Sequence, residues 1–514
     1  MKTLLLSLLL CGAVSVQARE YNVRDYGAVG DGHTIDSPAI NAAIQAAADA
    51  GGGTVVLPAG TYASYSVRLQ SGITLRLMQD AVLLAAEPVD GVGFDEPENY
   101  DWAYYQDFGH SHFRNSLIWG IGLHDIAIEG QGLIDGSSME SHRAGMDSHG
   151  VGNKGIALME CINVRLQDFS MLRCAHFALL ATGCDDMQIR DITVDTNRDG
   201  LDIDACHRVS ITGCTVNTPH DDAIVLKASY ALGRFRDCED IEVSDCHVSG
   251  YDCGTWLDGT HQLIGPKAPD RGGRTGRIKL GTESSGGYRR ISIHDCTFEH
   301  CRGLALETVD GGHLEDVHVA NITMHHIVNA AIFLRLGARL RSPEGTPVGT
   351  LRNVTIEHIR AYDVDSRYSS IIAGIPDHCI EDVTLRDIEL HYRGGCTLTD
   401  REPVIEQAPW EKPGYKEPQH TAGHNEAAPS PDEQEKMRRE MEAWRNTERD
   451  TALVCNLSYP VPEVIASYPE PWMFGIVPAS GFYIRHVRRL TMEDIRISFD
   501  KPDARPLYVR EDAD

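Results

Sequence analysis

The sequence lacks the patterns that mark several large classes of protein. It contains no Cys-x-x-Cys pair and no His-Glu-x-x-His motif, so the common zinc sites are excluded and no metal is expected. Basic residues are few, 47 against 75 acidic ones, and the formal net charge of −28 repels nucleic acid and anionic lipid. The apolar run Leu4–Leu10 is too short to span a bilayer as a stable helix. We therefore expect no nucleic-acid partner and no stable membrane insertion, and the sequence implies no cofactor.

The first residues are typical of a secretory signal. Lys2 supplies the positive start, Leu4–Leu10 the apolar region and Val16-Gln17-Ala18 a cleavage site of small residues. We expect residues 1–18 to be removed, which would leave a secreted or periplasmic chain of residues 19–514. A lipoprotein anchored through Cys11 is the alternative, although the leucines before it differ from the small residues expected there.

A repeated pattern of alternating apolar residues, interrupted by a polar kink, runs through most of the chain. It occurs in Asn163–Met171, Met187–Val194, Val209–Val216, Ile241–Val248, Ile291–Phe298, Val317–Met324, Val354–Ala361, Val383–Leu390 and Leu490–Ile497. A period of two indicates a strand, and the kink indicates a turn between two short strands. The shorter intervals between repeats, 22 to 29 residues, match one coil of a parallel β-helix. We therefore predict an all-β fold, a single-stranded right-handed parallel β-helix.

Two regions depart from the repeat. Residues 19–65 are expected to form an N-terminal cap whose helix starts near Asp36-Ser37-Pro38, with a good N-cap residue and Pro in the first turn. Residues 400–470 are predicted to be a charged insertion or lid within the single catalytic domain, and Ser430–Glu448 is a candidate amphipathic helix within it.

Some cysteines and histidines have a structural explanation. Cys214, Cys246 and Cys296 share one offset within their repeats, so we expect them to stack as a buried column of thiols. Four histidines that occur in close pairs are interpreted as surface residues: His110, His112, His325 and His326.

Carboxylates gather on two successive repeats. Asp199 and Asp221 are 22 residues apart, the same step as from Met187 to Val209, and Asp222 follows directly. We expect Asp199 and Asp221 to occupy equivalent positions on adjacent rungs, about 5 Å apart.

The strand after Asp199 adds two more acids. Leu201 and Ile203 alternate with Asp202 and Asp204, so the apolar pair can face the core while the acids face outward. Like charges this close raise one another's pKa, and glycoside hydrolysis needs one protonated carboxyl beside an ionised one. The alternative is that these acids cap turns or hold a structural cation.

The motifs of this region resemble a known family. Asn197-Arg198-Asp199-Gly200-Leu201-Asp202, followed by Asp221-Asp222, is similar to the polygalacturonases, family 28 of the glycoside hydrolases. Tyr26–Gly32 and Pro58–Tyr62 are similar to the same enzymes and their pectate-lyase-like relatives. The resemblance covers roughly residues 20–395 and implies an inverting hydrolase of α-linked galacturonate-type chains. It implies Asp221 as the general acid, with Asp199 and Asp222 holding and deprotonating the water.

The sequence departs from the family where the sugar would be gripped. The strand that matches the family's Gly-His-Gly reads Thr275–Glu283 and has no His, and the place of Arg-Ile-Lys reads Gly303–Thr308, without either cation. His220 replaces the usual Gly before the acid pair. We infer a sugar other than plain galacturonate, or one gripped by different cations. The candidate substrate-binding residues are Asp202, Arg198, His220, Lys227, Trp256, Arg277, Lys279 and Glu307.

The sequence thus predicts an exported O-glycosyl hydrolase that cleaves α-linked pectic polysaccharide, of the galacturonan or rhamnogalacturonan type. It is expected to be a monomer and to be exo-acting, because residues 400–470 could close one end of the cleft. Two alternatives stay open. One is a polysaccharide lyase with an Arg or Lys base and usually calcium. The other is a non-catalytic carbohydrate-binding β-helix.

Overall fold

The computed structural model describes residues 19–106, 108–140, 149–264, 273–401, 435–436, 439 and 453–514. The expected signal segment 1–18, and the expected helix Ser430–Glu448 apart from three of its residues, lie outside these ranges. Among the described helices, none is long and apolar enough to cross a membrane.

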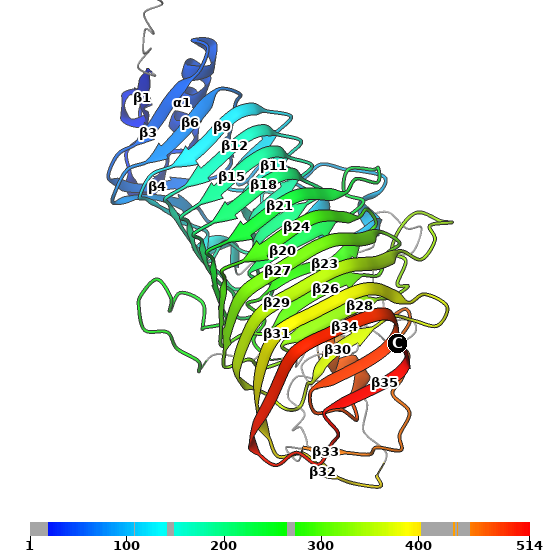
Figure 1. Cartoon of the computed structure of the whole chain (residues 1–514). Helices are drawn as coiled ribbons and strands as arrows, with labels where there is room; N and C mark the ends of the chain where they lie inside the picture. The colour runs from blue at the N-terminus through cyan, green and yellow to red at the C-terminus, as the bar shows by residue number, and fades with distance from the viewer. Residues whose placement is uncertain are drawn as a thin grey trace, which may run out of the picture.

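The chain coils into a right-handed parallel β-helix, which confirms the predicted fold, and its strands stack along three faces (Figure 1). The first face consists of β1 (Glu20–Asn22), β3 (Gly53–Leu57), β6 (Ile73–Leu77), β9 (His124–Glu129), β12 (Ile162–Gln167), β15 (Asp185–Arg190), β18 (His207–Thr212), β21 (Cys238–Ser244), β24 (Tyr288–His294), β27 (His313–His325), β29 (Thr350–Val364), β31 (Ile380–Gly394) and β34 (Phe482–Lys501).

The second face consists of β2 (Asp31–Ile35), β4 (Gly60–Ser64), β7 (Ala81–Ala85), β10 (Leu133–Asp135), β13 (Ser170–Leu172), β16 (Thr193–Asp195), β19 (Thr215–Asn217), β22 (His247–Ser249) and β25 (Thr297–Glu299). The third face consists of β5 (Val67–Arg68), β8 (Ile118–Ile121), β11 (Lys154–Met159), β14 (Phe177–Thr182), β17 (Asp199–Asp204), β20 (Ile224–Ala228), β23 (Ile278–Ser284), β26 (Leu304–Thr308), β28 (Ile332–Leu336), β30 (Ser370–Ala373) and β35 (Tyr508–Ala513).

The remaining elements are short or lie outside the coil. Strands β32 (Thr397–Leu398) and β33 (Val454–Cys455) pair with each other. The helical elements are α1 (Ser37–Asp49), α2 (Ser137–Glu140), η1 (Val23–Tyr26), η2 (Ala103–Tyr105), η3 (Phe108–Ser111) and η6 (Pro471–Phe474).

The polar kink of each repeat is a residue in the left-handed conformation between the first and second faces. Asp168, for example, has φ of 70° and Asp295 has φ of 56°. Asp and Asn tolerate this conformation better than most residues, because their short polar side chains bond locally. The other kink residues with positive φ are Asp191, Gly213, Asp245, Asn321, His358, Asp387 and Asp494. The predicted turn between two short strands is therefore confirmed in the first five repeats, whereas β27, β29, β31 and β34 continue through the kink as single strands.

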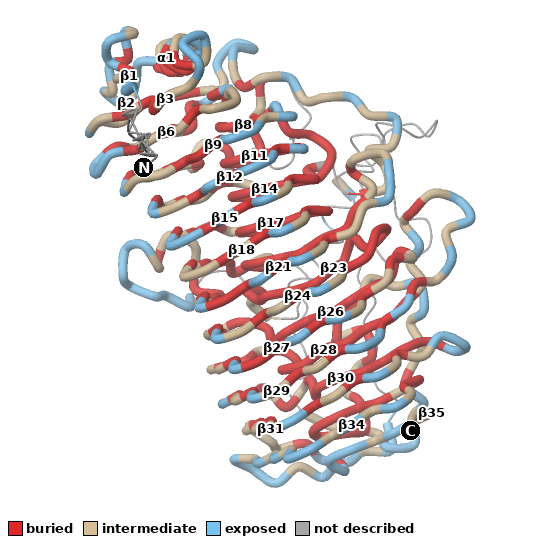
Figure 2. The backbone as a smooth tube through the Cα atoms, turned by 45° about the horizontal axis from the view of Figure 1, so that its top comes forward, coloured by how far each residue is buried: buried red, intermediate tan, exposed pale blue. Residues whose placement is uncertain are grey.

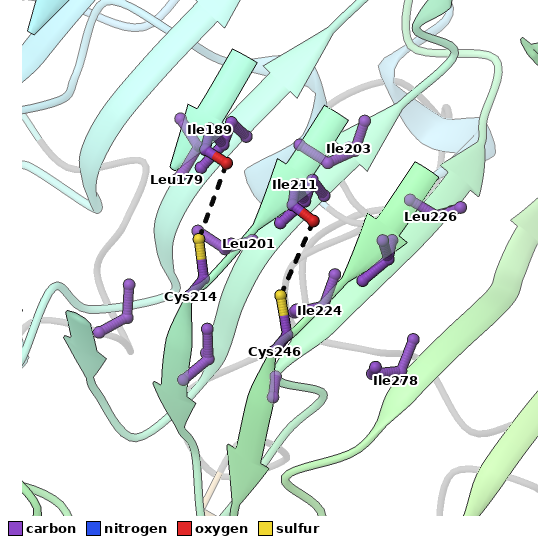
Figure 3. Close-up of a cluster of buried hydrophobic side chains, with 14 of the residues drawn as sticks. Leu179, Ile189, Leu201, Ile203, Ile211, Cys214, Ile224, Leu226, Cys246 and Ile278 are labelled. Carbon is purple, nitrogen blue, oxygen red and sulfur yellow. Dashed lines mark hydrogen bonds between the residues drawn. The ribbon is translucent and has the colours of Figure 1, made fainter. Parts of the chain in front are cut away.

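The interior of the coil is apolar along its length. Figure 2 shows that buried segments recur from one end of the coil to the other. Cys214, Cys246 and Cys296 are at most 2% exposed, so the predicted column of buried thiols is confirmed. Figure 3 shows Cys214 and Cys246 on successive rungs, each with Sγ 3.8 Å from the backbone oxygen of an isoleucine on the preceding repeat. Among the described residues, every cysteine is a free thiol.

Helix α1 lies at the N-terminal end of the coil, against β1, β3 and η1 (Figure 1). It buries Ile40, Ala43, Ile44 and Ala47. Asp36 precedes the helix as expected, but its side chain makes no capping hydrogen bond to it. The carboxylate instead accepts hydrogen bonds from the backbone of Val29 at 2.7 Å and Gly30 at 2.9 Å in the preceding loop. The helix covers apolar side chains that would otherwise face water at the open end of the coil.

Candidate active site

The predicted carboxylates lie on the third face, where β14, β17, β20 and β23 stack. The pairing of β17 with β20 sets Leu201 beside Ile224, a step of 23 residues. The expectation that Asp221 is equivalent to Asp199 is therefore wrong by one residue, since Asp222 takes that position. The step from β16 to β19 is 22 residues and that from β17 to β20 is 23, so the connection after β19 contains one extra residue. Asp221 sits in that connection, at the rim of the wall.

Asp199, Asp221 and Asp222, here called the carboxylate cluster, are in mutual reach. Each contributes an oxygen that lies within 4.8 Å of the others. The backbone N–H of Asp222 donates to Oδ1 of Asp199 and to Oδ1 of Asp221, both at 3.2 Å. The Asp221 side chain is 23% exposed, whereas those of Asp199 and Asp222 are 6% exposed. Asp221 is thus the member that a ligand reaches first.

Lys227, on β20, holds the inner side of the cluster. Its Nζ donates to Oδ2 of Asp199 at 3.1 Å and to Oδ2 of Asp202 at 2.8 Å. It also lies 2.7 Å from Nε2 of His110, which is itself 3.1 Å from Oδ2 of Asp202. As predicted, Leu201 and Ile203 enter the core while Asp202 points outward. Asp202 is nevertheless fully buried, because His110 on η3 covers it.

Two cations from the next rung hold Asp222. Arg277 Nε donates to Oδ1 of Asp222 at 2.8 Å, and Lys279 Nζ lies 3.4 Å from its Oδ2. Two of the cations that we named as candidates, Arg277 and Lys279, thus lie directly beside the cluster, whereas Gly303–Thr308 lacks a cation. The Arg277-Ile278-Lys279 segment itself lies one rung after Asp222, because Ile278 pairs with Ile224.

A segment much later in the chain, Ser467–Phe474, covers these cations; we call it the covering segment. Glu470 accepts hydrogen bonds from Arg277 and from Arg302, the latter at 2.8 Å. The Tyr468 hydroxyl lies 3.3 Å from Nζ of Lys279. Arg277, Lys279 and Arg302 are consequently at most 2% exposed. Each is already paired with a carboxylate of the protein itself.

The pKa values of the cluster are pushed apart. Burial, and after it the neighbouring Asp221, raises the pKa of Asp199 well above its ordinary value, although Lys227 opposes the shift. Burial would also raise the pKa of Asp222, but Lys279 and Arg277 outweigh it and lower that pKa to about 2. Burial lowers the pKa of Lys227, yet Asp199 and Asp202 together raise it well above the ordinary value. Asp222 and Lys227 therefore stay charged while Asp199 has a high proton affinity.

The other predicted ligand-binding residues lie at different depths. Arg198 Nη2 is 2.7 Å from Oδ2 of Asp221, and this arginine side chain is 18% exposed. His220 precedes Asp221 in the same turn and is half-buried. Glu307 is fully buried on β26, 3.5 Å from Lys279, and burial raises its pKa to about 7. Trp256 lies in the loop after β22, where its ring stacks on His261 with centroids 4.5 Å apart.

Several residues around the cluster were not found from the sequence. His110 and His112 are 2% and 4% exposed, so their interpretation as surface residues is wrong, whereas His326 is exposed and His325 half-buried. The only signal for His110 was its pairing with His112, which does not reveal a partner on a distant rung. Glu470 and Tyr468 lie in a segment without periodicity, so no spacing relates them to Arg277 or Lys279.

The chain's own cations occupy the positions that a metal would compete for. His110, Asp199 and Asp202 have ligand atoms within 4.8 Å of one another, as do the members of the carboxylate cluster. Lys227 Nζ binds all three residues of the first group. Arg198, Arg277 and Lys279 pair with the second group. We therefore assign no metal to either group.

Comparisons with known families agree with this geometry. The model of "Glycosyl hydrolases family 28" matches residues 106–254, which include the carboxylate cluster. The model of "Rhamnogalacturonase A/epimerase, pectate lyase-like" matches residues 21–76. A probable polygalacturonase from Vitis vinifera is 26% identical over 329 residues, 61% of this chain and 62% of that protein. One from Arabidopsis thaliana is 24% identical over 60% of each chain. The chain thus spans less than two thirds of the length of these relatives.

Solved structures share the fold. An exopolygalacturonase from Thermotoga maritima has a TM-score of 0.57 at 19% identity, covering 73% of this chain and 87% of that one. A family 28 exopolygalacturonase from Yersinia enterocolitica has a TM-score of 0.60 at 16% identity, covering 97% of this chain and 78% of that one. The matched family model and the related sequences make this chain similar to the polygalacturonases of glycoside hydrolase family 28, and the solved structures show the same fold.

Proposed function

We propose that this protein is an exported, inverting glycoside hydrolase that cleaves α-linked pectic polysaccharide at the carboxylate cluster. The observation that carries the proposal is the division of charge within the cluster. Asp222 is fixed as a carboxylate by Arg277 and Lys279, while Asp199 is buried and has a high proton affinity. Hydrolysis of a glycosidic bond needs such a pair of unlike carboxyl groups.

The roles follow from exposure and proton affinity. Asp221 is the most exposed of the three and protonates the leaving glycosidic oxygen as the C–O bond breaks. A water between Asp199 and Asp222 attacks the anomeric carbon, and its proton passes to Asp199, the stronger base of the two. Asp222 stays charged throughout and stabilises the positive charge that develops on the sugar ring. The proton that Asp199 takes up replaces, within the cluster, the one that Asp221 gave away.

Inversion is the finer part of the proposal. The cluster oxygens lie within 4.8 Å of one another, closer than the roughly 6.5–9.5 Å between carboxyl groups that is usual for inverting enzymes. We favour inversion because Asp222 is held by two cations and is a poor nucleophile, and because Asp199 is held by Lys227. Both are better suited to binding a water than to forming a bond to the sugar.

The substrate and the direction of cleavage belong to the same proposal. The backbone is galacturonan or rhamnogalacturonan, and a match to a rhamnogalacturonase-type model at residues 21–76 supports the second. Exo cleavage is supported by the covering segment, which closes over Arg277 and Lys279, and by two structural neighbours that are exopolygalacturonases. Export is supported by the signal-like residues 1–18 alone.

The test is digestion of galacturonan and rhamnogalacturonan by the purified protein, with chromatography of the products. A hydrolase releases new reducing ends and no unsaturated sugar. An unsaturated sugar would be detected by its ultraviolet absorbance. We expect single sugars or disaccharides from chain ends, released faster from rhamnogalacturonan. Faster release from unmodified galacturonan would contradict the rhamnogalacturonan assignment, and a mixture of long oligomers would contradict exo cleavage. An absorbing product would identify a lyase, and binding without any product would identify a carbohydrate-binding protein.

A further inference from the structure

One cation beside the carboxylate cluster differs from the others in its surroundings. Lys227, Arg277 and Lys279 are at most 6% exposed, and each is paired with at least two acids. The buried carboxylate of Glu470 already occupies Arg277, so a sugar carboxylate reaches that guanidinium only if the covering segment moves. Arg198 is 18% exposed and lies at the rim, against the most exposed acid.

The contact that Arg198 makes there conflicts with general acid catalysis. Its Nη2 lies 2.7 Å from Oδ2 of Asp221. The other oxygen of Asp221 accepts a hydrogen bond from the backbone of Asp222 at 3.2 Å. With Oδ1 engaged by the backbone, Oδ2 is the oxygen that remains to meet a glycosidic oxygen, and Arg198 already donates to it. A substrate group that draws Arg198 away therefore opens Oδ2 of Asp221 to the leaving group.

A uronate sugar brings that partner. Its carboxylate accepts two parallel hydrogen bonds from a guanidinium and so competes directly with Asp221. We propose that Arg198 binds the carboxylate of the sugar whose glycosidic oxygen is cleaved, and that this exchange releases Asp221 to receive the proton shared within the cluster. The proposal rests on the proposed function. It gives Arg198 two roles: it selects an anionic sugar, and it leaves Asp221 able to act as the acid only when that sugar is bound.

The proton has a short path to follow. Asp199 and Asp221 have oxygens within 4.8 Å and accept from the same N–H, that of Asp222. While Arg198 holds Asp221, the shared proton resides on Asp199, whose pKa burial raises. When Arg198 turns to the substrate, the proton moves to Asp221, and Asp199 becomes the carboxylate that activates water. The groups that face this pair are Lys227, His110, Asp202, Asp222 and Arg198. Asp222 is in turn held by Arg277 and Lys279.

The experiment compares free-acid and fully methyl-esterified oligomers of galacturonan and rhamnogalacturonan as substrates for the wild type and for Arg198→Gln. The wild type is expected to prefer the free acid by roughly 10- to 100-fold in kcat/KM, the value of a charge-assisted contact. In Arg198→Gln that preference should shrink to about 2-fold or less. Because Asp221 is no longer held, kcat of the variant on the ester should rise above the wild-type value. Arg198→Lys should keep part of the preference.

Arg208→Gln is the matched control, since Arg208 makes a similar ion pair, with Asp186 at 2.6 Å, away from the cluster. It should leave both rates unchanged. Equal losses on acid and ester in Arg198→Gln would overturn the proposal and reduce Arg198 to a support for Asp221. A lower kcat on the ester would contradict the exchange. A wild type that cleaves neither substrate would instead refute the proposed function.

Discussion

The cysteine column and the carboxylate cluster place like side chains on neighbouring rungs with opposite consequences. Cys214, Cys246 and Cys296 stack inside the coil, bonded to nearby backbone oxygens and to one another. Asp199 and Asp222 stack on the outside of the same coil and need three cations of the chain to do so. Neutral groups can repeat at the spacing of a rung without cost, whereas charges require interleaved partners. The proton affinity of each acid in this wall therefore depends on which cations lie beside it.

The largest effect on the rate should come from replacement of Asp221, the most exposed acid of the cluster. Asp221→Asn removes the proposed general acid without changing the size of the side chain, and kcat should fall by roughly 10²- to 10⁴-fold. The free energy of unfolding should change little, because Asp221 is partly exposed. Initial rates on the cleaved pectic substrate and a thermal melt measure the two quantities. Retention of more than a tenth of the activity would show that another group donates the proton.

The next largest effect tests the cost of stacking charges. Arg277→Gln leaves Asp222 and Glu470 buried with one cation fewer, and should lower the free energy of unfolding by about 3–5 kcal/mol. Arg208→Gln breaks an ion pair whose partners are about half exposed and should cost about 0–1 kcal/mol. Urea unfolding followed by circular dichroism measures both. Equal losses would mean that burial of the Arg277 network carries no special cost.

Replacement of Lys227 should change the rate less than the variants above, but it should shift the pH dependence of the rate in one direction. Lys227 lowers the raised pKa of Asp199, so Lys227→Met should raise that pKa further. Because the free enzyme must hold on Asp199 the proton that Asp221 later donates, the falling limb of kcat/KM against pH should move to higher pH, and activity should persist further on the alkaline side. Lys227→Arg keeps the charge and should move the limb less. A shift to lower pH would contradict the role of Asp199 as the group that holds this proton.

The smallest effect should come from the neutral column. Cys246→Ala removes one sulfur from the core, and should lower the free energy of unfolding by about 1 kcal/mol while leaving kcat and its pH profile unchanged. Urea unfolding and rate measurements on the same protein separate the two. A changed pH profile would mean that the core column and the carboxylate wall are coupled.

The same contrast explains what could be predicted from the sequence. The repeats, their kinks and the thiol column depend on neighbouring residues in a regular period, so the intervals between repeats locate them. The proximity of Asp199, Asp221 and Asp222 follows from the same period. The period does not predict which acid lies beside Asp199. One extra residue in the connection after β19 shifts the register, so that Asp222 takes this position instead of Asp221.

Contacts of residues that do not belong to the repeat could not be predicted from its spacing. His110 reaches Asp202 across 92 residues, and Glu470 reaches Arg277 across 193. Neither has a repeat that relates it to its partner, so only the three-dimensional path of the chain brings them together. The position of Arg277 and Lys279 could not be derived from the repeat either. The long connection between β22 and β23 separates Ile278 from its partner Ile224 by far more than one regular coil, so no interval relates these cations to Asp222.

The stereochemistry of the first product tests the central claim most directly. Proton NMR during digestion of the α-linked substrate resolves the anomer of each new reducing end before it equilibrates. Attack by a water held between Asp199 and Asp222 should release the β-anomer first, with the α-anomer growing in later. Initial release of the α-anomer would contradict this account, because it would require one of these carboxylates to form a covalent bond to the sugar.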